Sequence, residues 1–181
     1  MRSNFLLLLL AFITVFAVSC GSSNDEKWVS YTSANGGFVV NMPSGFKETE
    51  KQEKTAFGTQ LVHTVSWKPA TMSFVRFKLF QVSYTNCSVS PTDSIGMSAA
   101  LDSSIHLRIH DFTDNPVEID QIEFAGHPGR AFILDIGKEN TITVCKECIA
   151  NGKKYELTAI ALKSFSNEPQ INAFFDSFRI Q

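Results

Sequence analysis

The feature that most constrains the fold is an Asn151-Gly152 pair between two long apolar runs. The runs cover residues 141–150 and 155–162, and each has the length of a strand. Asn-Gly is the dipeptide best suited to a two-residue hairpin turn, in which both residues take a positive φ. Strands joined in this way are antiparallel neighbours. The sequence therefore predicts an antiparallel sheet built around this hairpin.

More strand patterns lie on both sides of a central helical segment. Turn residues Asn35-Gly36-Gly37 separate two short runs, and Pro43 ends the second of them. The sequence Gly126-His127-Pro128-Gly129 predicts a tight turn, and the charged segment 47–54 predicts a solvated loop or the start of a strand. The other predicted strands cover residues 28–31, 38–40, 61–67, 74–84, 117 onward and 131–136.

Two helices are expected. Ser90-Pro91-Thr92-Asp93 combines a serine cap, a proline at the first helical position and an acid in the first turn. This helix should run to about Ile109 and bury Met97, Leu101 and Ile105, which recur every four residues. A second helix should start near Pro169 and dock through an apolar face on the sheet. That face consists of Ile171, Phe174, Phe175 and Phe178. Helices packed on a mainly antiparallel sheet define the α+β class.

Composition narrows the range of functions. Of the 181 residues, 44% are hydrophobic and 19% are charged, as in an ordinary globular domain, and the length suits one domain. The 16 phenylalanines indicate a core rich in aromatic rings. Net charge is −2 and no basic block occurs, which argues against a nucleic-acid partner.

The N-terminal residues resemble the leader of a bacterial lipoprotein. Arg2 precedes an apolar run from Phe5 to Val18, too short for a spanning helix but typical of a signal peptide. Cys20 follows small residues at Ala17 and Ser19, as in a lipobox, although Ala17 stands where leucine is usual. We therefore predict a signal peptide over residues 1–19, a lipidated Cys20 with a flexible tether over 20–27, and one domain over 28–181. The alternative is ordinary secretion with a free Cys20.

The tether bears on localisation. Gly21 is not the aspartate associated with retention in the inner membrane, so the outer membrane is favoured, on its periplasmic side or at the cell surface. Asp25-Glu26 weakly resembles an acidic signal for surface export, but a soluble linker explains these residues better.

Four short segments follow one another between about Trp28 and Ile180: 37–46 (GFVVNMPSGF), 126–129 (GHPG), 151–155 (NGKKY) and 174–178 (FFDSF). Together they resemble the PsbP-like family, which includes photosystem II extrinsic proteins and many bacterial lipoproteins. The resemblance implies a curved antiparallel sheet between helices, used for binding rather than catalysis. The family has no shared catalytic motif, so the resemblance assigns no functional residue.

Cys145-Lys146-Glu147-Cys148 has the CxxC spacing of redox and metal sites. Inside a strand, however, residues i and i+3 point to opposite faces, and two ligands are too few for zinc. Ordinary strand cysteines are the favoured interpretation. If Cys20 carries lipid, Cys87, Cys145 and Cys148 can form at most one disulfide.

The four histidines give weak candidates. His106 and His110 are one helical turn apart, with Asp102 beside them, and should be exposed opposite the buried stripe. Such a row can hold a metal but more often makes weak contacts along a helix. His63 is expected to be a hydrogen-bonded core histidine, and His127 a turn residue. No metal site, cofactor or catalytic residue is therefore assigned.

These patterns favour a non-enzymatic, lipid-anchored binding or accessory protein of the cell envelope. Its partner would be an envelope protein or a small ligand. The alternatives are an envelope redox or metal-binding protein that uses Cys145 and Cys148, and a purely structural component. A concave pocket that gathers polar side chains would favour chemistry, whereas polar groups scattered over a convex surface would favour binding.

Overall fold

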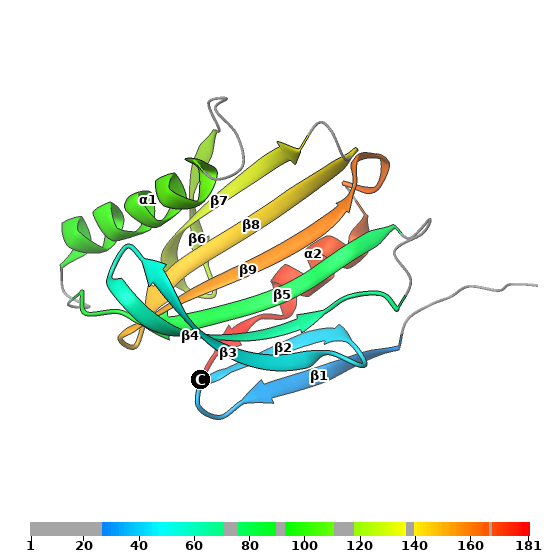
Figure 1. The fold of residues 1–181 in the computed structure, drawn as a ribbon, viewed down its shortest axis with the longest axis horizontal. Coiled ribbons are helices and arrows are strands. Elements are labelled where there is room, and N and C mark those ends of the chain that lie inside the picture. Colours follow the sequence, from blue (N-terminus) through cyan, green and yellow to red (C-terminus); the bar gives the residue numbers. More distant parts are fainter. Residues whose placement is uncertain (1–26, 71–75, 90–92, 111–117, 137–139, 167) are drawn as a thin grey trace, which may run out of the picture.

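The computed structural model describes residues 27–70, 76–89, 93–110, 118–136, 140–166 and 168–181 (Figure 1). The predicted signal peptide, Cys20 and all of the predicted tether except Lys27 lie outside these residues. No helix in the described ranges is long and apolar enough to cross a membrane. The elements follow in the order β1 Trp28–Ser33, β2 Phe38–Pro43, β3 Lys47–Thr55, β4 Gly58–Trp67, β5 Phe77–Asn86, α1 Ser94–His110, β6 Ile119–Phe124, β7 His127–Ile136, β8 Thr141–Ala150, β9 Lys153–Leu162, the short 3₁₀ helix η2 Lys163–Phe165, α2 Pro169–Ser177 and β10 Arg179–Ile180.

Seven strands form the large sheet, in the order β3-β4-β5-β9-β8-β7-β6, and all of its strand pairs are antiparallel. The predicted hairpin joins β8 to β9, with Ala150 opposite Lys153. Asn151 and Gly152 have φ of 51° and 71°, the positive values that this turn requires. A small sheet, β1-β2-β10, holds the two ends of the domain together.

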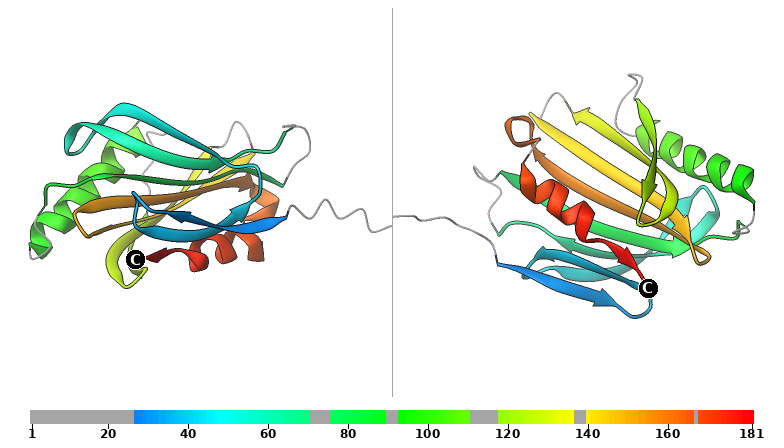
Figure 2. Two further views of the ribbon diagram at one scale, coloured as in Figure 1. Left: turned by 90° about the horizontal axis from the view of Figure 1, so that it is seen from below. Right: turned by 180° about the vertical axis from the view of Figure 1, so that it is seen from behind.

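The two helices cover opposite faces of the large sheet (Figures 1 and 2). Helix α1 lies across β7 and β8, with Leu101 and Ile105 buried as predicted. Helix α2 and the small sheet lie against the other face, which we call the α2 face. This arrangement confirms the α+β class, with one helix of 17 residues and a C-terminal helix of 9.

The core between the large sheet and α2 is rich in aromatic rings. The predicted helix face docks there, with Ile171, Phe174, Phe175 and Phe178 at most 3% exposed. Phe174 packs against Phe80 of β5, with ring centroids 5.1 Å apart. Burial of these rings is the main favourable term that holds α2 on the sheet.

Four local details sharpen or correct the predictions. Of the two alternatives for segment 47–54, the strand is the correct one: the segment is the edge strand β3, whose charged, exposed side chains discourage pairing with another chain. The tight turn lies at Ala125-Gly126, with φ of 52° and 80°, and His127 already begins β7. Strand β5 shifts register between Phe77 and Leu79, which brings Phe77 and Phe80 into the same core.

The start of α1 is the fourth difference. The helix begins at Ser94, and Asp93 caps it by accepting a hydrogen bond from the backbone N–H of Gly96 at 2.8 Å. Asp93 was predicted inside the first turn. The predicted cap and proline, Ser90 and Pro91, lie outside the described residues.

Candidate functional site

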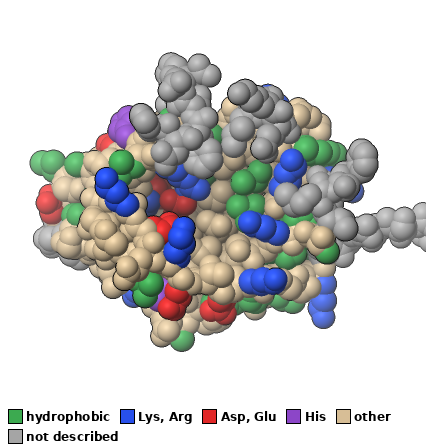
Figure 3. Space-filling model, viewed as in Figure 1, with side chains coloured by type: hydrophobic (Ala, Val, Ile, Leu, Met, Phe, Trp, Pro, Cys, Tyr) green, Lys and Arg blue, Asp and Glu red, His purple; other side chains and the backbone are tan. Residues whose placement is uncertain are grey.

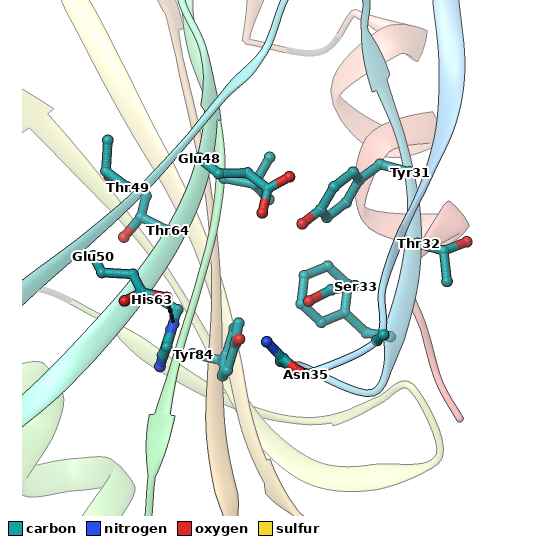
Figure 4. Close-up of a pocket in the computed structure, with 13 residues that line it drawn as sticks. Tyr31, Thr32, Ser33, Asn35, Glu48, Thr49, Glu50, His63, Thr64 and Tyr84 are labelled. Atoms are coloured by element: carbon teal, nitrogen blue, oxygen red, sulfur yellow. Dashed lines mark ion pairs between the residues drawn. The ribbon is translucent and has the colours of Figure 1, made fainter.

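A polar pocket of about 420 Å³ opens where the small sheet meets the edge of the large one (Figure 4). Its walls come from the end of β1, the following turn and the start of β2, and from β3, β4 and β5. The polar and aromatic residues that line it are Tyr31, Thr32, Ser33, Asn35, Phe38, Glu48, Thr49, Glu50, His63, Thr64 and Tyr84. Sequence reasoning singled out only His63 among them.

The β1–β2 turn that forms one wall is held by long-range contacts. The Tyr155 hydroxyl of β9 donates a hydrogen bond to the Gly36 carbonyl at 2.8 Å, and the Ser33 hydroxyl accepts one from the Gly36 N–H at 3.0 Å. Gly36 cannot carry a side chain without disturbance, because a Cβ there would lie 2.5 Å from the Phe38 ring. The wall is therefore fixed before any ligand arrives.

His63 lies at the pocket wall rather than deep in the core. Its Nδ1 pairs with a Glu50 carboxylate oxygen at 2.8 Å, and its ring stacks on Tyr84 with centroids 4.6 Å apart. The His63 side chain is 26% exposed, so the expectation of a hydrogen-bonded histidine holds but its core position does not. The Glu50 contact fixes the orientation of the imidazole.

Burial and two nearby carboxylates raise the pKa of both tyrosines in the pocket. Burial is the main cause that raises the pKa of Tyr31; a hydrogen bond with Ser33 lowers it, and the hydrogen bond and charge of Glu48 raise it further. The pKa of Tyr84 is raised mainly by burial and also by the charges of Glu50 and Glu48, against a lowering hydrogen bond with Ser33. In Figure 4 the Glu48 carboxylate and the Tyr31 hydroxyl point toward each other across the cavity.

A second hollow of about 570 Å³ lies on the opposite face, between the β3–β4 hairpin and α1. Figure 3 shows this face, where Lys and Arg side chains, with some Asp and Glu, stand around an area of uncharged side chains and backbone. Ser83 of β5 takes hydrogen bonds at 3.1 Å with Thr64 and Gln81. The polar side chains on the floor therefore largely satisfy one another.

Charged groups at this floor are also paired. Glu147 of β8 and Glu156 of β9 stand directly opposite each other. Lys154 contacts both carboxylates, at 2.8 Å and 3.2 Å, and Arg108 of α1 forms an ion pair with Glu156. This network ties α1 to the sheet, so we assign it a structural role and take the first pocket as the candidate site.

The cysteines do not form a redox pair in this structure. Cys87, Cys145 and Cys148 are free and buried. Cys145 packs under α1 and Cys148 on the α2 face, as the strand geometry predicted. Burial raises the pKa of Cys145 to about 11, and burial together with the charge of Glu147 raises that of Cys148 to about 12. Thiols with a pKa raised in this way are protonated at neutral pH and are poor nucleophiles.

The histidine candidates form no cluster among the described side chains, and the side chain of His110 lies outside the description. His106 is exposed on α1, and Asp102 instead accepts a hydrogen bond at 2.8 Å from Arg130 of β7. His127 is partly buried at the start of β7. Among the described residues, no three His, Cys, Asp or Glu side chains form a group able to hold a metal.

The fold as described, an antiparallel sheet with helices on both faces, is α+β and PsbP-like. It is similar to the solution structure of cyanobacterial PsbP (CyanoP) from Synechocystis sp. PCC 6803, with a TM-score of 0.57 over 90% of this chain and 98% of that one. Identity is 11%, so the likeness shows the fold alone. No family model and no curated protein matches the chain.

Proposed function

We propose that this chain is a lipid-anchored, non-enzymatic binding or accessory protein of the bacterial cell envelope. Membership of the PsbP-like family, predicted from the sequence, belongs to the same proposal. The observation that carries it is the pocket, where side chains from five strands and a turn converge on one open space. A small ligand, or one side chain of an envelope partner, fits a hollow of about 420 Å³.

The anchor is supported by the leader and by the position of Cys20. A lipidated Cys20 would hold the domain at a membrane surface through residues 20–27. Gly21 favours the outer membrane, facing the periplasm or the cell surface.

An envelope enzyme is the second candidate function, because the pocket is concave and gathers polar groups. The Glu50–His63 pair is the arrangement best suited to acid–base chemistry, since the carboxylate orients the imidazole. The redox alternative at Cys145 and Cys148 has less support, because the two thiols face different cores.

The discriminating experiment is affinity capture of the lipidated protein from its own membrane, with bound proteins and small molecules identified by mass spectrometry. A specific partner or unchanged ligand supports binding. A compound recovered in converted form supports the enzyme. Recovery of neither supports a purely structural component.

Replacing Cys20 by serine should release the protein from the membrane without unfolding it, because the acceptor of the lipid is lost while the domain is untouched. We expect wild type in the membrane fraction and Cys20→Ser in the soluble envelope fraction, with unchanged circular dichroism. Wild type that is already soluble would favour ordinary secretion. A serine variant that stays in the membrane fraction would refute the anchor.

A further inference from the structure

The ionisable side chains of the candidate pocket are predominantly acidic. Among the described residues that line it are Glu48, Glu50 and His63, and no Lys or Arg. The Glu50 carboxylate already pairs with the imidazole of His63. Glu48 forms no ion pair with any described residue and is exposed at the pocket mouth. One carboxylate therefore stays uncompensated in a concave site, where it attracts positive charge.

Two tyrosine rings complete the recognition surface. Tyr31 packs edge-on against Phe46 at 5.0 Å. Tyr84 stacks with one ring face on His63 at 4.6 Å and makes an edge contact with Phe38 at 5.9 Å. These contacts hold both rings in place. Tyrosine rings attract cations through their π systems, most strongly where water is partly excluded.

One uncharged acceptor also lines the pocket. Ser33 is buried at its back, and the side chain of Ser33 lies between Tyr31 and Tyr84 in Figure 4. An ammonium group needs several acceptors at once, because it carries up to three N–H donors. The Ser33 hydroxyl and the two oxygens of the Glu48 carboxylate can act as these acceptors.

From this combination we propose that the pocket binds an organic ammonium group, held by the Glu48 carboxylate and the Tyr31 and Tyr84 rings. This inference rests on the proposed binding function and specifies its ligand class. The ammonium belongs either to a free alkylamine or to the side chain of a lysine on a partner protein. The pocket is open on one side, so the alkyl chain of either can lead outward.

The test is an NMR titration of the ¹⁵N-labelled full chain in detergent micelles. The probes are n-pentylamine, the neutral n-pentanol as its isostere, and Nα-acetyl-lysine methylamide. We expect both amines to shift the backbone signals of residues 31–35 and 48–50, and the alcohol to leave them in place. Equal responses to amine and alcohol, or no response to either amine, would overturn the proposal.

Matched variants locate the effect. Glu48→Gln should weaken amine binding about tenfold or more, because it removes a charge-assisted hydrogen bond. Glu53→Gln removes the same charge from the other face of β3, next to Lys51, and should change affinity by less than about twofold. Tyr84→Leu should weaken binding about threefold or more through loss of the ring. Equal losses in the two glutamine variants would mean that only general surface charge attracts the amine.

The two amines distinguish the source of the ammonium. Binding of n-pentylamine and the lysine derivative with equal affinity supports a free amine, and clear preference for the derivative supports a partner's lysine. If neither binds but affinity capture still recovers a specific partner, the ligand class is wrong while the proposed binding function stands.

Discussion

Replacing Phe178 by alanine should lower the free energy of unfolding by about 3–5 kcal/mol, as expected for a fully buried phenylalanine. The Phe178 side chain is inaccessible to solvent. Its ring lies 5.4 Å from Phe38 of β2, 5.5 Å from Phe124 of β6 and 5.7 Å from Tyr155 of β9. One side chain therefore joins the small sheet, the far edge of the large sheet and the end of α2.

Urea unfolding followed by circular dichroism would measure the effect. Phe165→Ala is the control, because η2 has no buried residue and the loss there should be about 1 kcal/mol or less. If both alanine variants lose the same stability, the packing of Phe178 does not hold the C-terminal segment in place.

Replacing Lys154 by methionine should also cost about 3–5 kcal/mol, the range for removing one partner from a buried charge network. Strand register puts Glu147 and Glu156 side by side; Lys154 pairs with both, and Arg108 pairs with Glu156 as well. The Lys154 side chain is 11% exposed and that of Glu147 only 1%. Methionine keeps most of the side-chain volume of Lys154. The loss of stability therefore measures the effect of removing the cation that the two carboxylates share.

Lys163→Met is the matched control. Lys163 pairs with Asp135 at 2.7 Å, but both side chains are substantially exposed, so the loss should stay below about 1 kcal/mol. A similar loss in both lysine variants would show that burial does not strengthen the Lys154 network.

The stability deficit of Lys154→Met should depend on pH. Burial raises the pKa of Glu156, but the charges of Arg108 and Lys154 outweigh it, and the net pKa is lowered. The pKa of Glu147 is raised instead, because burial there outweighs the charge and hydrogen bond of Lys154. Because the pKa of Glu156 is lowered in the folded state, its ionisation stabilises the fold at pH values above the ordinary carboxyl pKa. This stabilisation is lost as the pH falls through the pKa of the folded state. The deficit should therefore be large at neutral pH and shrink below about pH 4, where carboxylates protonate. A deficit that is independent of pH would contradict this assignment.

Local pattern predicted most of the secondary structure, because short-range periodicity reflects which face of an element is buried. The β8–β9 hairpin and the apolar face of α2 were found in this way. Strand β3 could not be told from a solvated loop because both of its faces are exposed, so its sequence has no apolar alternation. Only its hydrogen bonds to β4 make it a strand. The register shift in β5 likewise interrupts the alternation of apolar and polar residues, so the sequence does not show which face of this strand is buried.

The candidate pocket could not be predicted, since it depends on contacts between distant segments. Tyr31, Glu48 and Tyr84 come from three strands in two different sheets. Alternation along β3 puts Glu48 and Glu50 on one face, but nothing local shows that this face meets β1. Their spacing of two residues was the one signal that the sequence offered.

The amino-acid sequence by itself determined the α+β class, the hairpin at Asn151-Gly152, the docking face of α2 and the opposite orientation of Cys145 and Cys148. Each of these follows from the period of a helix or a strand, which acts over a few residues. The tertiary structure decided that Glu147 lies opposite Glu156 and that Tyr31 faces Glu48. Register between strands and the packing of two sheets set these contacts, and both arise from burial summed over the whole chain rather than from any local segment.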